Sequence, residues 1–231
     1  MLHESNAYRK RVKPLAADGA TGSKKPPTRR SRAVAAKRSN IMSAALEFFS
    51  LYGMHGTSLD QVAERADVSK TNLLYYFPSK EELYVAVLKD LLDIWLEPLK
   101  ALNAEQQPME AIKQYIYLKL CVSRDHPQAS RLFCLEMLQG APLLKQVLST
   151  HLKQLVDEKS DIIREWVQAG QIAPIEPLHL LFILWATTQH YADFGVQIEA
   201  ISGQTLNDDA FFEQAVANIQ HIIAQGIRPV G

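Results

Sequence analysis

The stretch that decides the fold is "SLDQVAERADVSKTNLLYYFPSKEELY", residues 58–84. It contains closely spaced helix starts. Ser58 with Gln61, and Ser79 with Glu82, match capping boxes, in which the two side chains satisfy free amide groups of a first helical turn. The helices between these starts have only one or two turns, and such short helices are unstable alone because nucleation is costly. They must therefore be supported by longer helices packed behind them.

A longer helix precedes the stretch. Apolar residues repeat at intervals of three and four from Ile41 to Tyr52, which predicts an amphipathic helix that begins near residue 36. A sharp turn through Asp67 then leads to a short helix over residues 70–76. A supporting helix, a sharp turn and a short presented helix are the parts of a helix-turn-helix motif.

The presented helix carries side chains that suit DNA. Lys70, Thr71 and Asn72 occupy its first turn, where side chains can reach base edges or phosphates, and a helix N-terminus attracts a phosphate. A tyrosine hydroxyl can reach a phosphate while its ring packs locally, although two packed rings without a binding role are the alternative. The residues expected to contact DNA are Lys70, Thr71, Asn72, Tyr75, Tyr76, Lys80 and Ser58.

The segment from about Ala36 to Leu83 includes "GMHGTSLDQVAERADVSKTNLLYYFPSKEEL" and resembles the DNA-binding domain of the TetR family of transcriptional regulators. The resemblance implies a homodimer that binds a roughly palindromic double-stranded DNA operator, and whose C-terminal helices bind a small effector. The turn departs from the family pattern, because Asp67 stands where glycine is common. Asp tolerates left-handed backbone better than most residues, so we expect little effect on the fold.

The rest of the chain also has a helical pattern. No stretch alternates as a half-buried strand does, so the sequence predicts an all-α protein with about nine helices. The apolar helix over 177–201 is expected to pair with that over 208–226 in a four-helix dimer interface, as the family resemblance suggests; an internal core helix of a monomer is the alternative. The further stretches with a helical period are 109–125, 127–139, 142–169, 177–201 and 208–226.

The charge is unevenly distributed along the chain. Residues 1–38 hold eleven Lys and Arg against two acidic residues, a net charge of +9, while the remainder has a net charge of −9. A basic arm suits the phosphate backbone of DNA, although a solvated tail is the alternative. We therefore expect a basic, disordered arm over 1–35, a helix-turn-helix domain over 36–84, and a helical effector-binding and dimerisation domain over 85–231.

A line of polar and aromatic residues follows the 177–201 helix. Trp185, Gln189 and Asp193 are spaced by four, so they share one face, where a planar ligand could lie against the indole and bond to the amide. A core tryptophan with satisfied polar neighbours is the alternative. Arg131 and Lys119 are further charges within apolar helices, and for these two and Asp193 an ordinary salt bridge or solvated position is equally compatible with the sequence.

The C-terminal stretches "SRDHPQASRLFCLEMLQGAPLL" and "WATTQHYADF" resemble the branch of the family that regulates pyrimidine catabolism in response to uracil or thymine. The resemblance implies a pocket for a flat ring with alternating hydrogen-bond donors and acceptors. The residues expected to bind the effector are Trp185, Gln189, Asp193, Arg131 and Lys119.

Other functional classes lack support in the sequence. The seven histidines form no His-x-x-x-His pair, and there is no Gly-x-Ser-x-Gly, phosphate loop or dinucleotide fingerprint, so we expect neither an enzyme nor a metal or cofactor. No signal peptide or membrane span is expected, and the two cysteines suit a reducing compartment, which predicts a cytoplasmic protein that joins the nucleoid on binding DNA. Two rival functions remain: a TetR-type regulator with a non-pyrimidine effector, and an architectural protein that binds DNA broadly through its arm.

Overall fold

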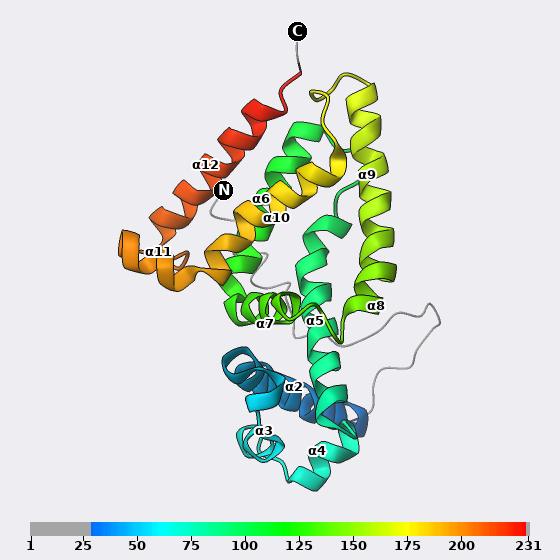
Figure 1. Ribbon diagram of the computed structural model, residues 1–231, viewed down its shortest axis with the longest axis vertical. Helices are drawn as coiled ribbons and strands as arrows, with labels where there is room; N and C mark the ends of the chain where they lie inside the picture. Colours follow the sequence, from blue (N-terminus) through cyan, green and yellow to red (C-terminus); the bar gives the residue numbers. More distant parts are fainter. Residues whose placement is uncertain (1–28, 230–231) are drawn as a thin grey trace.

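The computed structural model describes residues 29–229, which form helices and no strand (Figure 1). The prediction of an all-α protein is confirmed. The helices are α2 (Arg29–Gly56), α3 (Leu59–Arg65), α4 (Lys70–Tyr76), α5 (Lys80–Lys100), α6 (Pro108–Asp125), α7 (Pro127–Leu138), α8 (Lys145–Val147), the π-helix η1 (Leu148–Leu152), α9 (Lys153–Gln168), α10 (Pro177–Asp193), α11 (Gly195–Ser202) and α12 (Asp209–Gly226).

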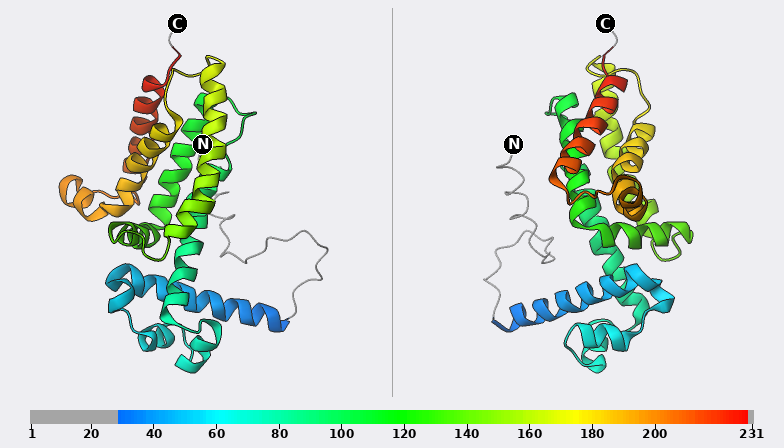
Figure 2. Two further views of the ribbon diagram at one scale, coloured as in Figure 1. Left: turned by 45° about the vertical axis from the view of Figure 1, so that its right-hand side comes forward. Right: turned by 90° about the vertical axis from the view of Figure 1, so that its left-hand side faces the viewer.

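The molecule has a small head at one end and a larger helical body at the other (Figures 1 and 2). Helices α2, α3 and α4 form the head, and α5 runs from the head into the body. Helices α6 and α10 pack against each other in the body, with α12 against α6 and α9 against α10. Helix α7 lies where head and body meet, because it packs against α2, α5 and α10. The arrangement gives α5 and α7 contact with both parts.

Two hydrophobic cores hold these parts together. One joins the head to α7 and contains Phe49, Leu73, Leu83 and Leu132, each of which is fully buried. The other lies among α6, α9, α10 and α12. The side chain of Phe49 also meets the ring of Tyr84 edge to face, with 4.9 Å between ring centres. The predicted support of the short head helices by their longer neighbours is therefore confirmed.

The structure corrects the predicted start of the first helix. Helix α2 begins at Arg29, so residues 29–35, which we expected to belong to a disordered arm, are helical. Arg, Ala and Lys, which dominate the start of α2, are strong helix formers, and this outweighs the lack of apolar periodicity there. The rest of the predicted arm lies outside the described residues.

A single helix over 177–201 was also a wrong prediction. The helix ends at Phe194, whose φ of −113° and ψ of 27° are not helical, and α11 then sets off in another direction (Figure 1). Gly195, a poor helix former, follows this break. Over 142–169 the helical stretch contains η1. Within η1 the hydroxyls of Ser149 and Thr150 donate hydrogen bonds to the carbonyl of Gln146, which lies just before it. Such bonds compete with the regular helical pattern.

The turn between α3 and α4 has the predicted left-handed residue. Asp67 has a φ of 54°, a conformation that Asp adopts more readily than most residues other than glycine. The departure from the family's usual glycine therefore leaves the turn intact. Among the described residues, no helix is both long and apolar enough to cross a membrane.

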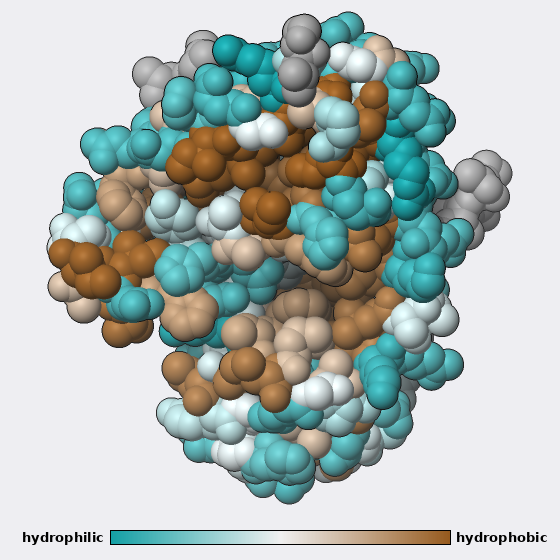
Figure 3. Space-filling model, turned by 45° about the horizontal axis from the view of Figure 1, so that its top comes forward, coloured by the Kyte–Doolittle hydropathy of each residue, from teal (hydrophilic) through white to brown (hydrophobic). Residues whose placement is uncertain are grey.

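Large apolar side chains remain exposed on the last helices of the subunit. Figure 3 shows apolar residues gathered in a band across one face of the body and on the protruding α11. Single exposed apolar residues are ordinary, whereas a gathered set marks an interaction surface. The exposed set on α10 to α12 and the break between α10 and α11 is Leu178, Phe182, Ile183, Phe194, Val196, Ile201 and Ile222.

Candidate nucleic-acid interface and effector cluster

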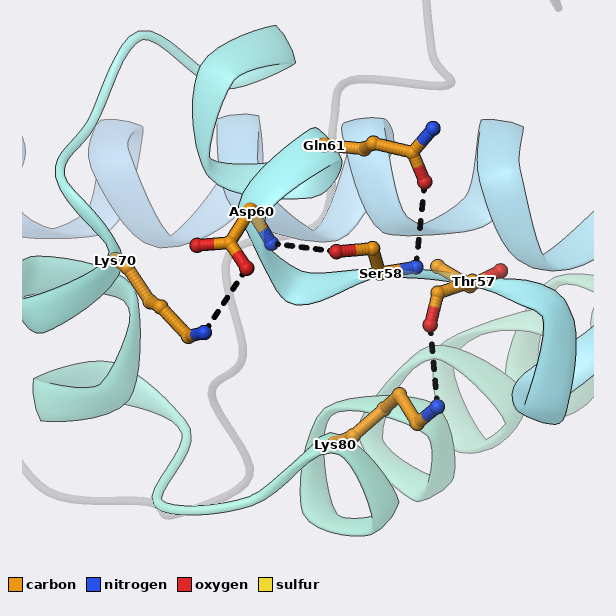
Figure 4. Close-up of polar contacts among 6 residues, drawn as sticks. All are labelled: Thr57, Ser58, Asp60, Gln61, Lys70 and Lys80. Atoms are coloured by element: carbon orange, nitrogen blue, oxygen red, sulfur yellow. Dashed lines mark hydrogen bonds and ion pairs between the residues drawn. The ribbon is translucent and has the colours of Figure 1, made fainter.

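The first turn of α3 is built by the predicted capping box (Figure 4). The Ser58 hydroxyl accepts a hydrogen bond from the amide of Asp60 at 3.2 Å, and the Gln61 side chain accepts one from the amide of Ser58 at 3.4 Å. Ser58, expected to contact DNA, therefore has a structural role at this cap. Its hydroxyl still has a proton to donate to a phosphate.

Lys80 is held close to the same turn. Its Nζ donates a hydrogen bond to the carbonyl of Thr57 at 3.1 Å, which fastens the first turn of α5 to the segment before α3 (Figure 4). Thr57 itself is buried. An ammonium group has three N–H donors, so Lys80 retains donors for a phosphate.

Helix α4 is anchored on one side and open on the other. The Ser69 hydroxyl caps it by accepting from the amide of Asn72 at 3.1 Å. Leu73 is fully buried and Phe77 is 4% exposed, so these two side chains anchor the helix to the core of the head. On the outer side Thr71 is exposed, and Tyr75 is 82% exposed. An apolar side chain packed behind the helix thus leaves its polar face free for a partner.

The outer face also contains an ion pair. Lys70 Nζ lies 2.9 Å from Asp60 Oδ2, which links α4 to α3 (Figure 4). Both side chains are at least half exposed, and such a pair contributes little to stability. Lys70 can therefore exchange this carboxylate for a phosphate at low energetic cost. Asn72 and Tyr76 are half-buried beside it.

In the body, α6 and α10 bring together residues that lie seventy positions apart in the sequence. The Trp185 indole on α10 donates a hydrogen bond to the hydroxyl of Tyr115 on α6, at 2.8 Å. Burial raises the pKa of Tyr115, and the bond from Trp185 partly opposes this. The Trp185 ring also lies 5.8 Å from that of Phe182, centre to centre.

Lys119 lies one turn after Tyr115 on α6 and is only 3% exposed. Its Nζ is 3.7 Å from the centre of the Trp95 ring on α5, a cation–π contact. Burial lowers the pKa of Lys119 to about 7, and the nearby charge of Asp193 partly opposes this. The Trp95 indole nitrogen is buried and has no hydrogen-bond partner in the described part of the chain. Two polar groups with spare bonding capacity thus lie side by side.

Asp193 completes this group from the end of α10. Its carboxylate accepts a short hydrogen bond from the Ser130 hydroxyl on α7. Burial raises the pKa of Asp193, while hydrogen bonds from Ser130 and Gln189 and the charge of Lys119 lower it. Asp193 is therefore tied to three helices: its own, α6 and α7.

Four of the five expected effector residues share this region, which we call the effector cluster: Trp95, Tyr115, Lys119, Ser130, Trp185, Gln189 and Asp193. Arg131 is the exception. It follows Ser130 in the chain, but its Nε is buried without a hydrogen-bond partner among residues 29–229. Trp95, Tyr115 and Ser130 were not singled out from the sequence. The four-residue spacing of Tyr115 and Lys119 was the available signal for one of them.

A groove of about 580 Å³ lies between α10, α11 and α12. Thr187, His190 and Tyr191 of α10 line it together with Ile198 and Phe211. Residues 187 and 191 are out of step with the Trp185–Gln189 line by half a helical turn, so this groove and the effector cluster use different faces of α10. Of the exposed apolar set, Ile201 lines this groove, whereas Phe182 lies beside Trp185 of the cluster.

Two family models together match most of the chain. Residues 41–87 match the model described as "Bacterial regulatory proteins, tetR family". Residues 88–230 match the model described as "YcdC-like protein, C-terminal region". The first covers the head from residue 41 onward, and the second covers all of the effector cluster.

Curated relatives agree with these matches. The "HTH-type transcriptional regulator RutR" of Escherichia coli strain K12 is 62% identical over 208 residues, which cover 90% of this chain and 98% of that protein. The "HTH-type transcriptional repressor NicS" of Pseudomonas putida is 28% identical, over 58% of this chain and 63% of its own length. The identity to RutR is therefore spread over both head and body.

Solved structures show the same fold. A putative transcriptional regulator from Streptomyces coelicolor, SCO4942, has a TM-score of 0.67 at 22% identity, covering 84% of this chain and 99% of its own. AibR, solved with isovaleryl coenzyme A and operator DNA, has a TM-score of 0.61 at 17% identity, covering 80% and 97%. With both halves matched by family models and 62% identity to a regulator along nearly its whole length, the chain belongs to the TetR family of bacterial transcriptional regulators, DNA-binding proteins rather than enzymes.

Proposed function

We propose that this regulator binds its operator as a homodimer through α4 and releases it when a planar pyrimidine, uracil or thymine, enters the effector cluster. The observation that carries the proposal is the position of Asp193, whose bonds reach the cluster on one side and α7, at the junction with the head, on the other. The division of labour between residues 36–84 and 85–231 belongs to the proposal, as does a cytoplasmic site of action at nucleoid DNA.

The outer face of α4 supports the DNA-binding part. Thr and Asn side chains can read base edges, and Lys can contact either a base or a phosphate. Thr71 and Asn72 occupy the first turn of α4, where the free amides also favour a phosphate. In a dimer the two α4 helices would enter successive major grooves of a palindrome. The centres of the two half-sites would then be about 34–36 Å apart, or somewhat more.

The exposed apolar band supports the dimer. Phe182 and Ile183 on α10 and Ile222 on α12 are each between 45% and 67% exposed in one subunit. Their burial against the same residues of a second subunit would remove the band from water, since a two-fold interface uses one patch on both partners. Each subunit would then supply two helices, α10 and α12, to a four-helix interface.

The chemistry of the effector cluster supports a pyrimidine dione. Uracil and thymine present carbonyl acceptors and N–H donors alternately around a flat ring. The Lys119 ammonium is a donor, the Gln189 amide is both donor and acceptor, and the Asp193 carboxylate is an acceptor. The indoles of Trp95 and Trp185 offer flat surfaces beside these groups. The resemblance to pyrimidine-responsive relatives selects this ligand class among planar rings.

A chain of contacts could pass the signal from the cluster to the head. Asp193 bonds Ser130 at the start of α7, and Glu136 near its end accepts hydrogen bonds from the Tyr84 hydroxyl at 3.1 Å and the Leu143 amide at 2.8 Å. Glu136 is 1% exposed, and Tyr84 belongs to α5. A ligand that competes with Ser130 for the Asp193 carboxylate would therefore change the contacts between α7 and α5. The required coupling is modest, about 1–3 kcal/mol.

The role of α4 can be tested with Asn72→Ala and Thr71→Ala. Each variant should bind a palindrome selected from random DNA about tenfold more weakly, because a side chain that reads a base contributes roughly 1–3 kcal/mol. Binding to an unrelated duplex should be unchanged. Fluorescence anisotropy titrations measure both affinities, with Lys145→Ala on the body as the control. Unchanged selectivity in both α4 variants would refute the placement.

The effector assignment can be tested by calorimetric titration with uracil, thymine and cytosine. Saturable binding of uracil or thymine, but not cytosine, is expected. Trp185→Ala and Gln189→Ala should weaken it at least about tenfold, since each removes more than about 1.4 kcal/mol of contacts. Thr187→Ala, on the other face of α10, is the control. No heat from any of the three bases would remove the pyrimidine assignment and leave the DNA-binding assignment standing.

The coupling route can be tested with Tyr84→Phe, which keeps the ring packed against Phe49 and removes the bond to Glu136. The buried carboxylate loses a donor, which lowers the free energy of unfolding by about 1–3 kcal/mol. Affinity for uracil alone should be retained, while the ratio of operator affinities without and with uracil should fall towards one. A ratio equal to that of the wild type would exclude this route.

The buried amine of Lys119 predicts a pH dependence of stability. Its pKa is about 7 in the folded chain, against the ordinary 10.5, so the unfolded state binds more protons between these values. The free energy of unfolding should therefore increase as the pH is raised from about 7.5 to about 9. This gain in stability should disappear when the pH is lowered again. Urea titrations should show this rise in the wild type and its loss in Lys119→Met. An identical rise in the variant would assign it to another group.

A further inference from the structure

The chain passes between the two hydrophobic cores at three places. We call the core that joins the head to α7 the head core, and the core among α6, α9, α10 and α12 the body core. Helix α5 makes the first crossing as an unbroken helix, and the corner at His126 between α6 and α7 makes the second. The third crossing lies within η1, because Leu148 packs against the head core and Leu152 against the body core. This crossing has no loop, so any movement there must bend a helix.

Hydrogen bonding is irregular at the third crossing. The amide of Lys153 bonds the carbonyl of Leu148, five residues back, whereas an α-helix uses the carbonyl four residues back. The hydroxyls of Ser149 and Thr150 take the carbonyl of Gln146, which in an α-helix serves the amide of residue 150. No residue of η1 is buried. Irregular bonding without packing makes η1 the most easily bent part of the rod formed by α8, η1 and α9.

The chain before η1 is held firmly by the head. Leu144 is fully buried in the head core, and the amide of Leu143 donates to the Glu136 carboxylate at 2.8 Å. Ala141 has a φ of 54°, which is unfavourable for a residue with a side chain, and it precedes Pro142, before which extended backbone is preferred. Such strain persists only where the surrounding contacts over-determine the backbone. The chain as far as the start of η1 therefore belongs mechanically to the head.

The chain after η1 is held by the body. Val156, Ile163 and Trp166 of α9 are buried in the body core. The segment after α9 is fastened as well, since the amide of Ala173 bonds the carbonyl of Ile227 at 2.9 Å. Figure 1 shows α9 as a long rod that rises from the junction through the body. Five residues of irregular helix thus separate two anchored segments.

We propose that η1 is a hinge about which the head, together with α7 and α8, turns against the body when the effector binds. The inference rests on the proposed response to uracil or thymine, which requires the head to change its position. If α5 moves with the head as one rod, the other two crossings must yield. The corner at His126 is already non-helical, and η1 is where the third crossing can bend without displacing a buried side chain.

Hydrogen exchange of the full chain, followed by mass spectrometry, tests the hinge directly. The amides of residues 149–153 should exchange at least about tenfold faster than those of residues 159–166, because opening at η1 breaks irregular bonds and exposes no core. Uracil should change the exchange rate of 149–153 by at least about threefold and leave that of 159–166 unchanged. Equal rates in the two segments, or no response of 149–153 to uracil, would overturn the hinge.

Stiffening the hinge tests its role in the response. Ser149→Ala and Thr150→Ala combined remove the hydroxyls that compete for the Gln146 carbonyl and introduce the best helix former. Affinity for uracil should be retained. The ratio of operator affinities without and with uracil, expected to lie in the range of about 5–150, should fall at least about threefold. Ser149→Gly and Thr150→Gly combined remove the same hydroxyls but loosen the turn, so this variant should keep the wild-type ratio.

The matched control replaces two exposed polar residues of α9, Gln154→Ala and Glu165→Ala, and should keep the wild-type ratio. A full response in the alanine variant of η1, or an equal loss in the control, contradicts the hinge and leaves the effector response standing. A wild type whose operator affinity does not respond to uracil refutes the proposed function, and the hinge with it. The behaviour of the wild type therefore separates the two failures.

Discussion

The burial of Leu73 is the contact on which the position of α4 depends. A helix of seven residues cannot hold its shape in water, and α4 has only its Ser69 cap and this one fully buried side chain within its length. Phe49 behind it and Leu83 after it belong to the same core. Because the apolar anchor is on one side only, the opposite face is free to carry residues chosen for a partner rather than for packing.

The body shows the opposite arrangement, in which polar groups are placed where they are unfavourable. Burying the Lys119 amine disfavours its charged form, and the nearby charge of Asp193 only partly opposes this lowering of its pKa. A core made for stability alone would have an apolar residue at this position. The unfavourable burial is understandable if a ligand completes the hydrogen bonds, and it makes the cluster responsive, since small changes in bonding there carry large free energies.

The sequence predicted the head better than the body. Caps such as Ser58 and Ser79 act within a few residues, so their bonds can be anticipated from spacing alone. The bond from Trp185 to Tyr115 joins residues seventy positions apart, and the contact of Lys119 with Trp95 joins two helices whose relative position no local pattern contains. Shared spacing on α10 did identify Trp185, Gln189 and Asp193 as neighbours. The break at Phe194 was missed because apolar residues continue through it.

The position of α7 has a consequence for how the subunit can be divided. Leu132 and Leu144 are fully buried in the same core as Phe49 and Leu73, so the hydrophobic interior of the head is completed by residues far beyond its end in the sequence. Head and α7 should therefore open and close as one cooperative unit. An excised head would expose the surface that α7 covers, and a chimaera that exchanges heads between members of the family would have to exchange the facing side of α7 as well.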